Sequence, residues 1–352
     1  MNNTSMKAVV YLAPGKVEVQ ETPRPIPAAG EVLVAISSNT ICGTDLRIAK
    51  GIKRKGVVAP RILGHEVAGR VAEIGEGVSV VSVGDTVGVL PTYSCGSCSE
   101  CQRGNFHLCR ASNVLGHQAD GGLADFLLVP AKAVADGVLV RYATDVDPVA
   151  ISLAEPLSCI LHGQKFLDIG FGDVVLVIGG GAIGLMHARV AKLAGARTVI
   201  VSEPMQFRRT MAIDFGADLT VDPRTEDLPA IVAEHTGGVG ADVVIVCIGV
   251  PVLVNDALTL ARNHGRVSLF AGFPTDEASP IDANLIHYKE LRVVGSSNST
   301  IVDYQRAIAL VESGAIDTAK LVTHRFGLDG YHEAVDMINH PEALKVAMIP
   351  GL

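Results

Sequence analysis

Residues 174–184, with the sequence VVLVIGGGAIG, constrain the fold of this chain more than any other stretch. The uninterrupted apolar run at its start predicts a strand that is buried on both faces. This run leads into a G-x-G-x-x-G sequence at 179–184, after which apolar residues recur at helical spacing. In such a strand–turn–helix unit the glycines permit a tight turn, close approach of a pyrophosphate to the backbone, and packing of the helix on the strand. The pattern predicts a dinucleotide site, although an ordinary glycine-rich turn is the simpler alternative.

A carboxylate follows about 20 residues after the last glycine, just beyond the next predicted strand. Here Glu203 can accept hydrogen bonds from the adenosine ribose and would repel a 2′-phosphate, which favours NAD over NADP. Arg208 and Arg209 are a counter-signal, because an arginine can accommodate that phosphate. We give Glu203 more weight, since the arginines fall at the start of the next predicted helix. The expected cofactor-binding residues are Gly179, Gly181, Ile183, Gly184, Glu203 and Arg208.

The chain has two parts that differ in their predicted secondary structure. Up to about residue 150, short strands separated by glycine and proline predict a mostly β domain, with strands near 7–12, 16–20, 31–37, 64–74, 83–89 and 124–129. Strands and helices then alternate, which predicts a doubly wound parallel sheet of the α/β class, with strands near 174–178, 198–201, 242–248, 265–270 and 291–294. Helices are expected within 147–167 and near 205–215, 252–262 and 302–313. The last helix and a strand at 345–349 could cap this sheet or return to the β domain. The polar residues 1–5 are expected to fray.

Charge and hydropathy narrow the possible partners. A formal net charge of −8 and a pI near 5.8 argue against nucleic acid as a partner. No apolar run approaches the roughly 20 residues that span a bilayer, so no membrane partner is expected. The first residues lack the apolar region of a secretory signal, which makes a cytoplasmic location the default expectation.

Four of the seven cysteines fall within fifteen positions, at Cys95, Cys98, Cys101 and Cys109. In a chain without a secretory signal, this spacing predicts a metal site rather than disulfides. Four thiolates can close a tetrahedron around zinc and leave no open position, as in a structural site. An iron–sulfur cluster, which cysteine thiolates also hold, and unmetallated thiols are the alternatives.

A second candidate metal site is dispersed along the chain. Its possible ligands are the thiolate of Cys42, the imidazole of His65 and the carboxylates of Glu66 and Glu155. Three protein ligands of these types with an open fourth position form a catalytic zinc site. Each residue also has a simpler explanation: Cys42 could be a small buried apolar residue, His65 a hydrogen-bonded core histidine, and the glutamates a helix cap or surface charges.

Several segments, taken in order, resemble the zinc-dependent medium-chain alcohol dehydrogenases. They are C-G-T-D at 42–45, G-H-E-V-A-G at 64–69, V-G-D-T-V at 83–87, the four-cysteine segment, D-G-G-L-A-D-F at 120–126, A-E-P-L at 154–157 and GGGAIG at 179–184. A glutamate before proline is similar to the polyol (sorbitol-type) and threonine 3-dehydrogenase branch. The resemblance implies a GroES-like catalytic domain of residues 1–156 and 294–352 and a Rossmann NAD-binding domain of residues 157–293. It also implies an active site in the cleft between them.

The resemblance further implies which residues bind the catalytic zinc. Cys42 and His65 would hold the ion, with Glu66 or Glu155 as the third ligand. A zinc ion with the thiolate and both carboxylates would carry an excess negative charge, which opposes the stabilisation of a negatively charged substrate oxygen. We therefore expect one carboxylate to bind directly and the other to act through water.

Thr44, Asp45 and Glu155 are the expected catalytic residues. The Thr44 hydroxyl can pass the substrate's proton onward, and Asp45 can accept the free N–H of His65. Relatives often have a histidine where this chain has Arg47, which cannot act as a base. Arg47 also opens a basic run that could be a solvated loop, attract an anionic substrate such as a sugar acid or sugar phosphate, or contact the cofactor's phosphates. The loop at 113–120 could line the pocket, and its His117 could equally be an ordinary surface residue.

These observations predict an NAD-dependent enzyme with two zinc ions per chain, one catalytic and one structural. Its expected reaction is oxidation of a secondary hydroxyl of a polyol or related sugar derivative, a small-molecule substrate. Within the same class, an L-threonine 3-dehydrogenase-like enzyme or a sugar-acid or sugar-phosphate dehydrogenase is the alternative. A non-catalytic zinc- and nucleotide-binding protein is the alternative from a different class. The resemblance also implies a homo-oligomer, either a dimer or a tetramer.

Overall fold

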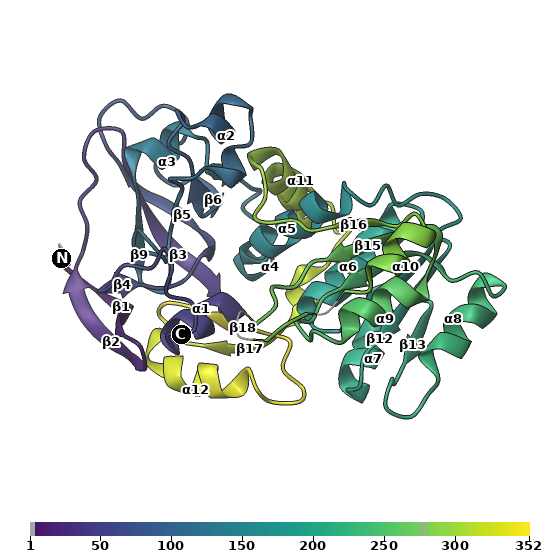
Figure 1. Cartoon of the computed structure of the whole chain (residues 1–352). Coiled ribbons are helices and arrows are strands. Elements are labelled where there is room, and N and C mark those ends of the chain that lie inside the picture. The colour runs from purple at the N-terminus through teal and green to yellow at the C-terminus, as the bar shows by residue number, and fades with distance from the viewer. Residues whose placement is uncertain (1–3, 275–276, 280) are drawn as a thin grey trace. The chain divides into compact units, whose positions relative to one another are not determined.

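The structure of the chain is a computed structural model that describes residues 4–274, 277–279 and 281–352 (Figure 1). Its contacts divide the chain into two units, Met1–Ser158 with Asn298–Leu352, and Cys159–Ser297. Of the five polar residues expected to fray, Ser5 already lies in the first strand, and residues 1–3 lie outside the described part.

The first unit is built mainly from β-sheet. A three-stranded sheet has the order β2-β1-β4, formed by β1 (Ser5–Ala13), β2 (Lys16–Pro23) and β4 (Arg61–Ile62). A seven-stranded sheet has the order β10-β6-β5-β3-β18-β17, and β9 also pairs with β3. Its strands are β3 (Val32–Thr40), β5 (Glu66–Ile74), β6 (Thr86–Val89), β9 (Phe126–Val129), β10 (Leu139–Arg141), β17 (Val322–Phe326) and β18 (Lys345–Met348). A small ribbon pairs β7 (Thr92–Tyr93) with β8 (Asn113–Val114).

Short helices connect these strands. They are α1 (Gly43–Ala49), α2 (Ser99–Gln102), α3 (Ala131–Ala135), α4 (Pro148–Ser152), the beginning of α5 (Ala154–Gln164), α11 (Ile301–Glu312) and α12 (Tyr331–Met337), with single 3₁₀ turns at Phe106–Leu108, Thr318–Leu321 and Leu328–Gly330. One core cluster of this unit packs Val9 of β1 against Ile48 of α1, Leu63, and Tyr331 of α12. The amino-terminal strand, α1 and the carboxyl-terminal helix therefore share one core.

The carboxyl-terminal segment returns to the first unit. Strand β18 pairs antiparallel with β3, with Ala347 opposite Thr40 and Met348 opposite Asn39, and parallel with β17. Helix α11 contacts α4 of the same unit. Of the two arrangements that the sequence leaves open for this segment, the structure has the return to the β domain.

The second unit is a doubly wound α/β layer. Its six strands are all parallel, in the order β13-β12-β11-β14-β15-β16. They are β11 (Val174–Ile178), β12 (Thr198–Ser202), β13 (Leu219–Val221), β14 (Ala241–Val246), β15 (Ala261–Leu269) and β16 (Arg292–Val294), and the helices are α6 (Ala182–Leu193), α7 (Gln206–Asp214), α8 (Leu228–Thr236), α9 (Leu253–Leu260) and α10 (Ala283–Tyr288). All five residues of β11 are buried, as expected for a parallel strand covered on both faces. The predicted α/β class, with a mostly β unit beside a parallel sheet, is confirmed.

Several elements differ from the sequence-based expectation. The helix expected within 147–167 is two helices, α4 and α5, which are separated at Leu153. Pro156 explains the break, because its nitrogen cannot donate to the carbonyl of Ser152 and its ring crowds that position. Strand β15 begins at Ala261, earlier than the expected residue 265. Helix α1 and the β13–α8 pair were not anticipated. Among the described residues, no helix is both long and apolar enough to cross a bilayer.

Candidate metal and cofactor sites

Asp45 connects the two residues expected to bind the catalytic metal. It is fully buried in the first turn of α1, and its two carboxylate oxygens have different partners. Oδ2 accepts the backbone N–H of Cys42 at 2.9 Å, while Oδ1 lies 3.1 Å from His65 Nδ1 and accepts the N–H of Gly64 at 3.3 Å. Burial alone would raise the pKa of Asp45, but the His65 charge and these hydrogen bonds lower it. An ionised Asp45 thus positions both the Cys42 backbone and the His65 ring.

Cys42, His65 and Glu66 converge on one point. Cys42 is the N-cap of α1, His65 directly precedes β5, and Glu66 is its first residue. One ligand atom from each of the three lies within 4.8 Å of the others. Because His65 Nδ1 faces Asp45, Nε2 is available to a metal. Burial alone would lower the pKa of His65, but Asp45 and Cys42 raise it well above its usual value. The site therefore stabilises positive charge, and its donor atoms fit a zinc ion.

Lys345, which lies in no sequence motif and was not predicted as a site residue, binds one of these candidate ligands. Its Nζ donates to both carboxylate oxygens of Glu66, at 2.6 and 2.5 Å, and to the carbonyl of Ile41 at 3.3 Å. The Thr40 hydroxyl donates to Glu66 Oε2 as well. The side chains of Lys345 and Glu66 are 9% and 1% exposed, so this is a buried ion pair. Three adjacent strands supply it, with Lys345 on β18, Thr40 on β3 and Glu66 on β5.

Glu155 and Thr44 are two further expected site residues of the first unit. Glu155 is half-buried in the first turn of α5, and Thr44 is half-buried in the first turn of α1. Burial alone would lower the pKa of Lys345, but Glu66, Cys42 and Glu155 raise it. Glu155 therefore acts electrostatically on the same ammonium group. Within the described part of the chain, the set of ligand atoms that meet within 4.8 Å includes Glu66 and not Glu155.

His117 is buried beside this cluster. Its ring lies edge-on to that of His65, with the centroids 5.3 Å apart, and the residue is 6% exposed. Nε2 of His117 is buried and has no hydrogen-bond partner among the described residues. Burial, together with the charges of His65 and Lys53, lowers the pKa of His117 to about 3. His117 is therefore not an ordinary surface residue, which was one of the two alternatives that the sequence left open.

The four clustered cysteines form a second, separate centre. Their Sγ atoms are 3.4 Å (Cys95–Cys109), 3.6 Å (Cys98–Cys101), 3.8 Å (Cys98–Cys109) and 3.9 Å (Cys95–Cys101) apart. Sulfurs about 2.3 Å from a tetrahedral zinc ion would lie about 3.8 Å from one another. The backbone N–H groups of Ser97 and Cys98 lower the pKa of Cys95 to about 6, which favours the thiolate that a metal needs. These residues fit a structural zinc ion, whose four positions they would fill.

The glycine-rich turn has the geometry that close helix–strand packing requires. Gly179 has a φ of +101°, a conformation that side chains rarely adopt. A Cβ on Gly184 would lie 1.8 Å from the carbonyl oxygen of Gly179, so only glycine fits there. Gly181 is the N-cap of α6, and no atom outside its own neighbours lies within 4 Å of its Cβ position. Ile183 follows, half-buried, in the first turn of α6. The open space at Gly181 and the free N–H groups of the helix start suit a pyrophosphate.

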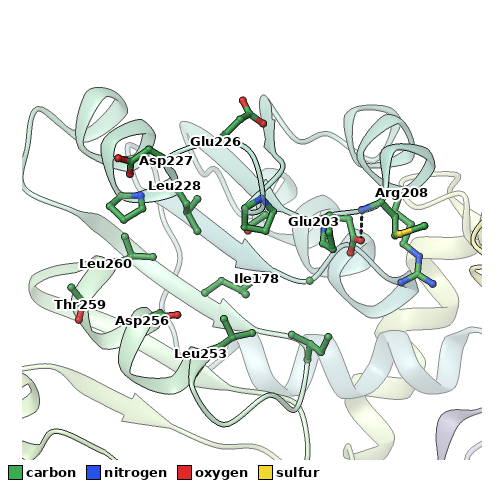
Figure 2. Close-up of a pocket in the computed structure, with 17 residues that line it drawn as sticks. Ile178, Glu203, Arg208, Glu226, Asp227, Leu228, Leu253, Asp256, Thr259 and Leu260 are labelled. Atoms are coloured by element: carbon green, nitrogen blue, oxygen red, sulfur yellow. Dashed lines mark hydrogen bonds between the residues drawn. The ribbon is translucent and has the colours of Figure 1, made fainter.

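A pocket of about 680 Å³ opens at the ends of β11 and β12 (Figure 2). Gly179, Glu203 and Arg208 are among its lining residues, whereas Gly181, Ile183 and Gly184 are not. Figure 2 shows Glu203 and Arg208 toward one end, and Asp227, Thr259 and Leu260 at the other, with Leu228, Leu253 and Ile178 between them. The middle of the cavity is apolar and charged groups lie at both ends, which suits a nucleoside.

Glu203 is held in a fixed orientation. It is only 4% exposed, and its oxygens accept the backbone N–H groups of Gly180 at 2.8 Å and Met205 at 2.9 Å. A carboxylate has further acceptor positions, so it can still receive a hydrogen bond from a ribose hydroxyl.

The two arginines that follow have different environments. Arg209 donates to the carbonyls of Glu203 and Pro204 and, at 3.1 Å, to Asp222 Oδ2. Asp222 also binds Arg224, and the two arginines, Arg224 first, lower the pKa of Asp222 to about 2. Arg209 is thus bound to other groups, and Arg208 is the one that lines the pocket.

Comparison with known proteins identifies one domain family in each half of the chain. Residues 28–137 match the alcohol dehydrogenase GroES-like domain, and residues 182–313 match the zinc-binding dehydrogenase family. The chain is 35% identical to the L-threonine 3-dehydrogenase of Pyrococcus furiosus over 94% of both chains, and 34% identical to the sorbitol dehydrogenase of Halalkalibacterium halodurans over 98% of this chain and 99% of that one. A solved structure of a putative zinc-binding dehydrogenase from Sinorhizobium meliloti, bound to NADP, is 36% identical, with a TM-score of 0.92 over 99% of this chain and all of the other.

Proposed function

The chain belongs to the zinc-dependent medium-chain alcohol dehydrogenases, in the branch of the threonine and polyol dehydrogenases, and from this we propose a reaction for it. It oxidises a secondary hydroxyl of a polyol or related sugar derivative to a ketone and transfers the hydride to NAD. The observation that carries the proposal is the convergence of Cys42, His65 and Glu66, ordered by Asp45 and joined by a buried Lys345.

We propose that Cys42, His65 and Glu155 bind the catalytic zinc. Both oxygens of Glu66 already accept hydrogen bonds from Lys345, which favours Glu66 acting from behind the ligands rather than as one of them. When bound, zinc would lower the pKa of a substrate hydroxyl at its open position, as it does for water. Asp45 holds His65 through Nδ1, which would leave Nε2 free to bind the ion.

The ammonium of Lys345 offsets the charge of this site. A divalent ion with one thiolate and two carboxylates has an excess of one negative charge, which would oppose loss of a proton from the substrate. The neighbouring anions keep Lys345 protonated despite its burial. With that cation counted, the group of charges is formally neutral.

The proton of the substrate hydroxyl would move through Thr44. A hydroxyl both accepts and donates, so the Thr44 side chain can take this proton and pass one to water. Arg47, in the same helix, is always protonated and cannot accept it. We therefore propose a short relay that ends at water.

The preference for NAD over NADP is proposed from Glu203. NAD, when bound, supplies the hydride acceptor, and Glu203 would accept hydrogen bonds from its adenosine ribose. Among the described residues that line the pocket, Glu226, Asp227 and Asp256 are acidic and Arg208 is the one cation. Such an acidic pocket repels a 2′-phosphate. A Glu203→Gln variant should therefore use NADP better relative to NAD, by about tenfold or more.

The test is reduction of NAD and NADP in the presence of polyols, sugar acids, sugar phosphates and L-threonine, with zinc analysis of the same sample. We expect NAD to be reduced with at least one secondary alcohol, and about two zinc ions per chain. Cys42→Ser should lower the zinc content by one and abolish turnover, while Cys159→Ser is the matched control outside the metal cluster. A zinc content near one, with no reduction of either cofactor, would instead support a non-catalytic zinc- and nucleotide-binding protein.

L-Threonine is a specific alternative substrate, because the threonine 3-dehydrogenase of P. furiosus is similar over almost the whole chain. Its secondary hydroxyl would occupy the same position at the metal as that of a polyol. The panel separates the two: a kcat/KM for L-threonine at least tenfold above that for every polyol would favour the amino acid.

A further inference from the structure

A basic segment adjoins the proposed metal site. Residues 47–55, RIAKGIKRK, contain five lysines or arginines and no acidic residue, in a chain whose net charge is −8. The segment starts within α1, the helix whose N-cap is Cys42 and whose first turn contains Asp45. Positive charge is thus concentrated beside the metal cluster against the general charge of the chain.

Lys53 lacks an anionic partner in this segment. It is half-buried, and within the described residues its Nζ has neither a hydrogen bond nor an ion pair. Burial and the charge of Arg47 lower the pKa of Lys53, whereas the charges of Cys42 and Asp45 raise it. Asp45 is already bound to His65, and Cys42 would give its charge to the metal. A half-buried cation would then remain uncompensated.

His117 offers an unused hydrogen-bonding atom in the same region. Its Nε2 is buried without a partner among the described residues, and its ring touches His65. The carbonyl of His117 accepts the N–H of Val58 at 3.1 Å, which joins its loop to the basic segment. Gly56 permits this contact, since a Cβ there would lie 2.7 Å from Gln118 Nε2. The loops that carry Lys53 and His117 are thus paired with each other.

We infer that the substrate of this enzyme carries a carboxylate or phosphate group, which Lys53 binds as an ion pair while His117 Nε2 hydrogen-bonds to the same molecule. This rests on the proposed function, because the anionic group must belong to a molecule whose hydroxyl lies at the metal. An unpaired half-buried cation and a buried unpaired polar atom both incur a free-energy penalty that an anionic ligand removes. A neutral polyol would leave the Lys53 charge unmatched.

The test compares matched substrates on matched variants. Each aldonate or alditol phosphate is paired with the alditol of the same configuration, and L-threonine with L-threoninol, so that only the anionic group changes. Lys53→Met removes the charge and keeps the stem, Lys53→Arg keeps the charge, and Lys55→Met is the control at an exposed lysine of the same run. The readouts are kcat/KM for each pair, NADH affinity by fluorescence, and the shift in melting temperature that each ligand produces with NAD present.

We expect the wild type to favour the anionic member of a pair by about tenfold to a hundredfold, as for a hydrogen bond to a charged group. Lys53→Met should lose this preference and keep both its turnover of the neutral alcohol and its NADH affinity. Lys53→Arg should retain most of the preference, and Lys55→Met should match the wild type. Thermal stabilisation by the anionic ligand should likewise disappear in Lys53→Met, whether or not that ligand is turned over.

Three results would overturn the inference. The first is an equal kcat/KM of the wild type for the anionic and the neutral substrate of each pair. The proposed dehydrogenase function would still stand in that case. The second is weaker NADH binding in Lys53→Met with equal losses on all substrates, which would assign the lysine to the cofactor. The third is no anion-dependent thermal shift in any variant. If the shift depends on Lys53 but no compound is oxidised, the anion site stands and the proposed reaction fails.

Discussion

Replacing Lys345 with methionine should destabilise the protein by about 3–5 kcal/mol, because Glu66 would keep a buried charge without its partner. The Glu66 side chain is 1% exposed, and both of its oxygens lie within 2.6 Å of Lys345 Nζ, so water cannot replace the ammonium without rearrangement. The carbonyl of Ile41 would also lose a donor. For domains of 150–250 residues, each kcal/mol lowers the melting temperature by about 2–4 °C. The expected fall is therefore about 6–20 °C.

A double-mutant cycle separates this charge effect from lost packing. Lys345→Met and Glu66→Gln each leave one buried charge unpaired, whereas the double variant leaves none. We expect the double variant to be at least about 2 kcal/mol more stable than the sum of the single effects. The exposed pair Lys7–Asp329, at 2.6 Å but with side chains 36% and 78% exposed, is the control and should couple by less than about 1 kcal/mol.

The assay is denaturant unfolding of the four proteins, with metal-free and zinc-loaded samples, and cobalt(II) absorption as a report on the ligand set. In Lys345→Met, Glu66 loses its ion pair, and we expect the cobalt spectrum to change as a result. The activity of this variant should fall by about tenfold to a hundredfold. Lys345→Arg should restore both the spectrum and the activity. Additive stabilities in the cycle, or a melting temperature within 2 °C of the wild type, would refute the reasoning from the buried pair.

Three further predictions concern other parts of the chain. Cys98→Ser should reduce the zinc content by one per chain and lower the melting temperature, measured by metal analysis and calorimetry, because three thiolates leave the tetrahedron open. Gly184→Ala should weaken NADH binding by at least about tenfold in a fluorescence titration, since its Cβ would meet the Gly179 carbonyl at 1.8 Å. Burial lowers the pKa of His187 to about 3, whereas the unfolded chain titrates near 6.5, so its contribution is full above pH 6.5 and declines as the pH falls toward 3. His187→Gln should remove an acid-dependent loss of about 2 kcal/mol between pH 8 and pH 5 in denaturant unfolding, and the exposed His332→Gln should not.

The features that the sequence predicts well are local ones. The glycine turn and the four-cysteine segment each depend on residues a few positions apart, and the chain's own geometry brings such residues together. The sequence predicts one helix within 147–167, whereas the structure has two, α4 and α5. Pro156 interrupts the helix although the apolar residues continue at helical spacing past it. Lys345 could not be found in this way, since it lies 279 residues from Glu66 and meets it only through the strand order β18-β3-β5. The one signal for Lys345 is a lysine that opens a short apolar strand, KVAM, in which every residue is buried.

The register of the last strand therefore contributes to the chemistry as well as to the fold. Ala347 lies opposite Thr40, and Thr40 lies opposite Glu66, so the pairing of three strands determines which side chains face the metal cluster. A shift of one residue in β18 would turn Lys345 to the other face of the sheet, because side chains alternate along a strand. Glu66 would then be a buried, uncompensated anion behind the proposed metal ligands. In the sequence, the carboxyl-terminal segment follows the nucleotide-binding unit, yet it folds as part of the first unit. This arrangement has a chemical reason, because the segment supplies Lys345, the cation that pairs with Glu66.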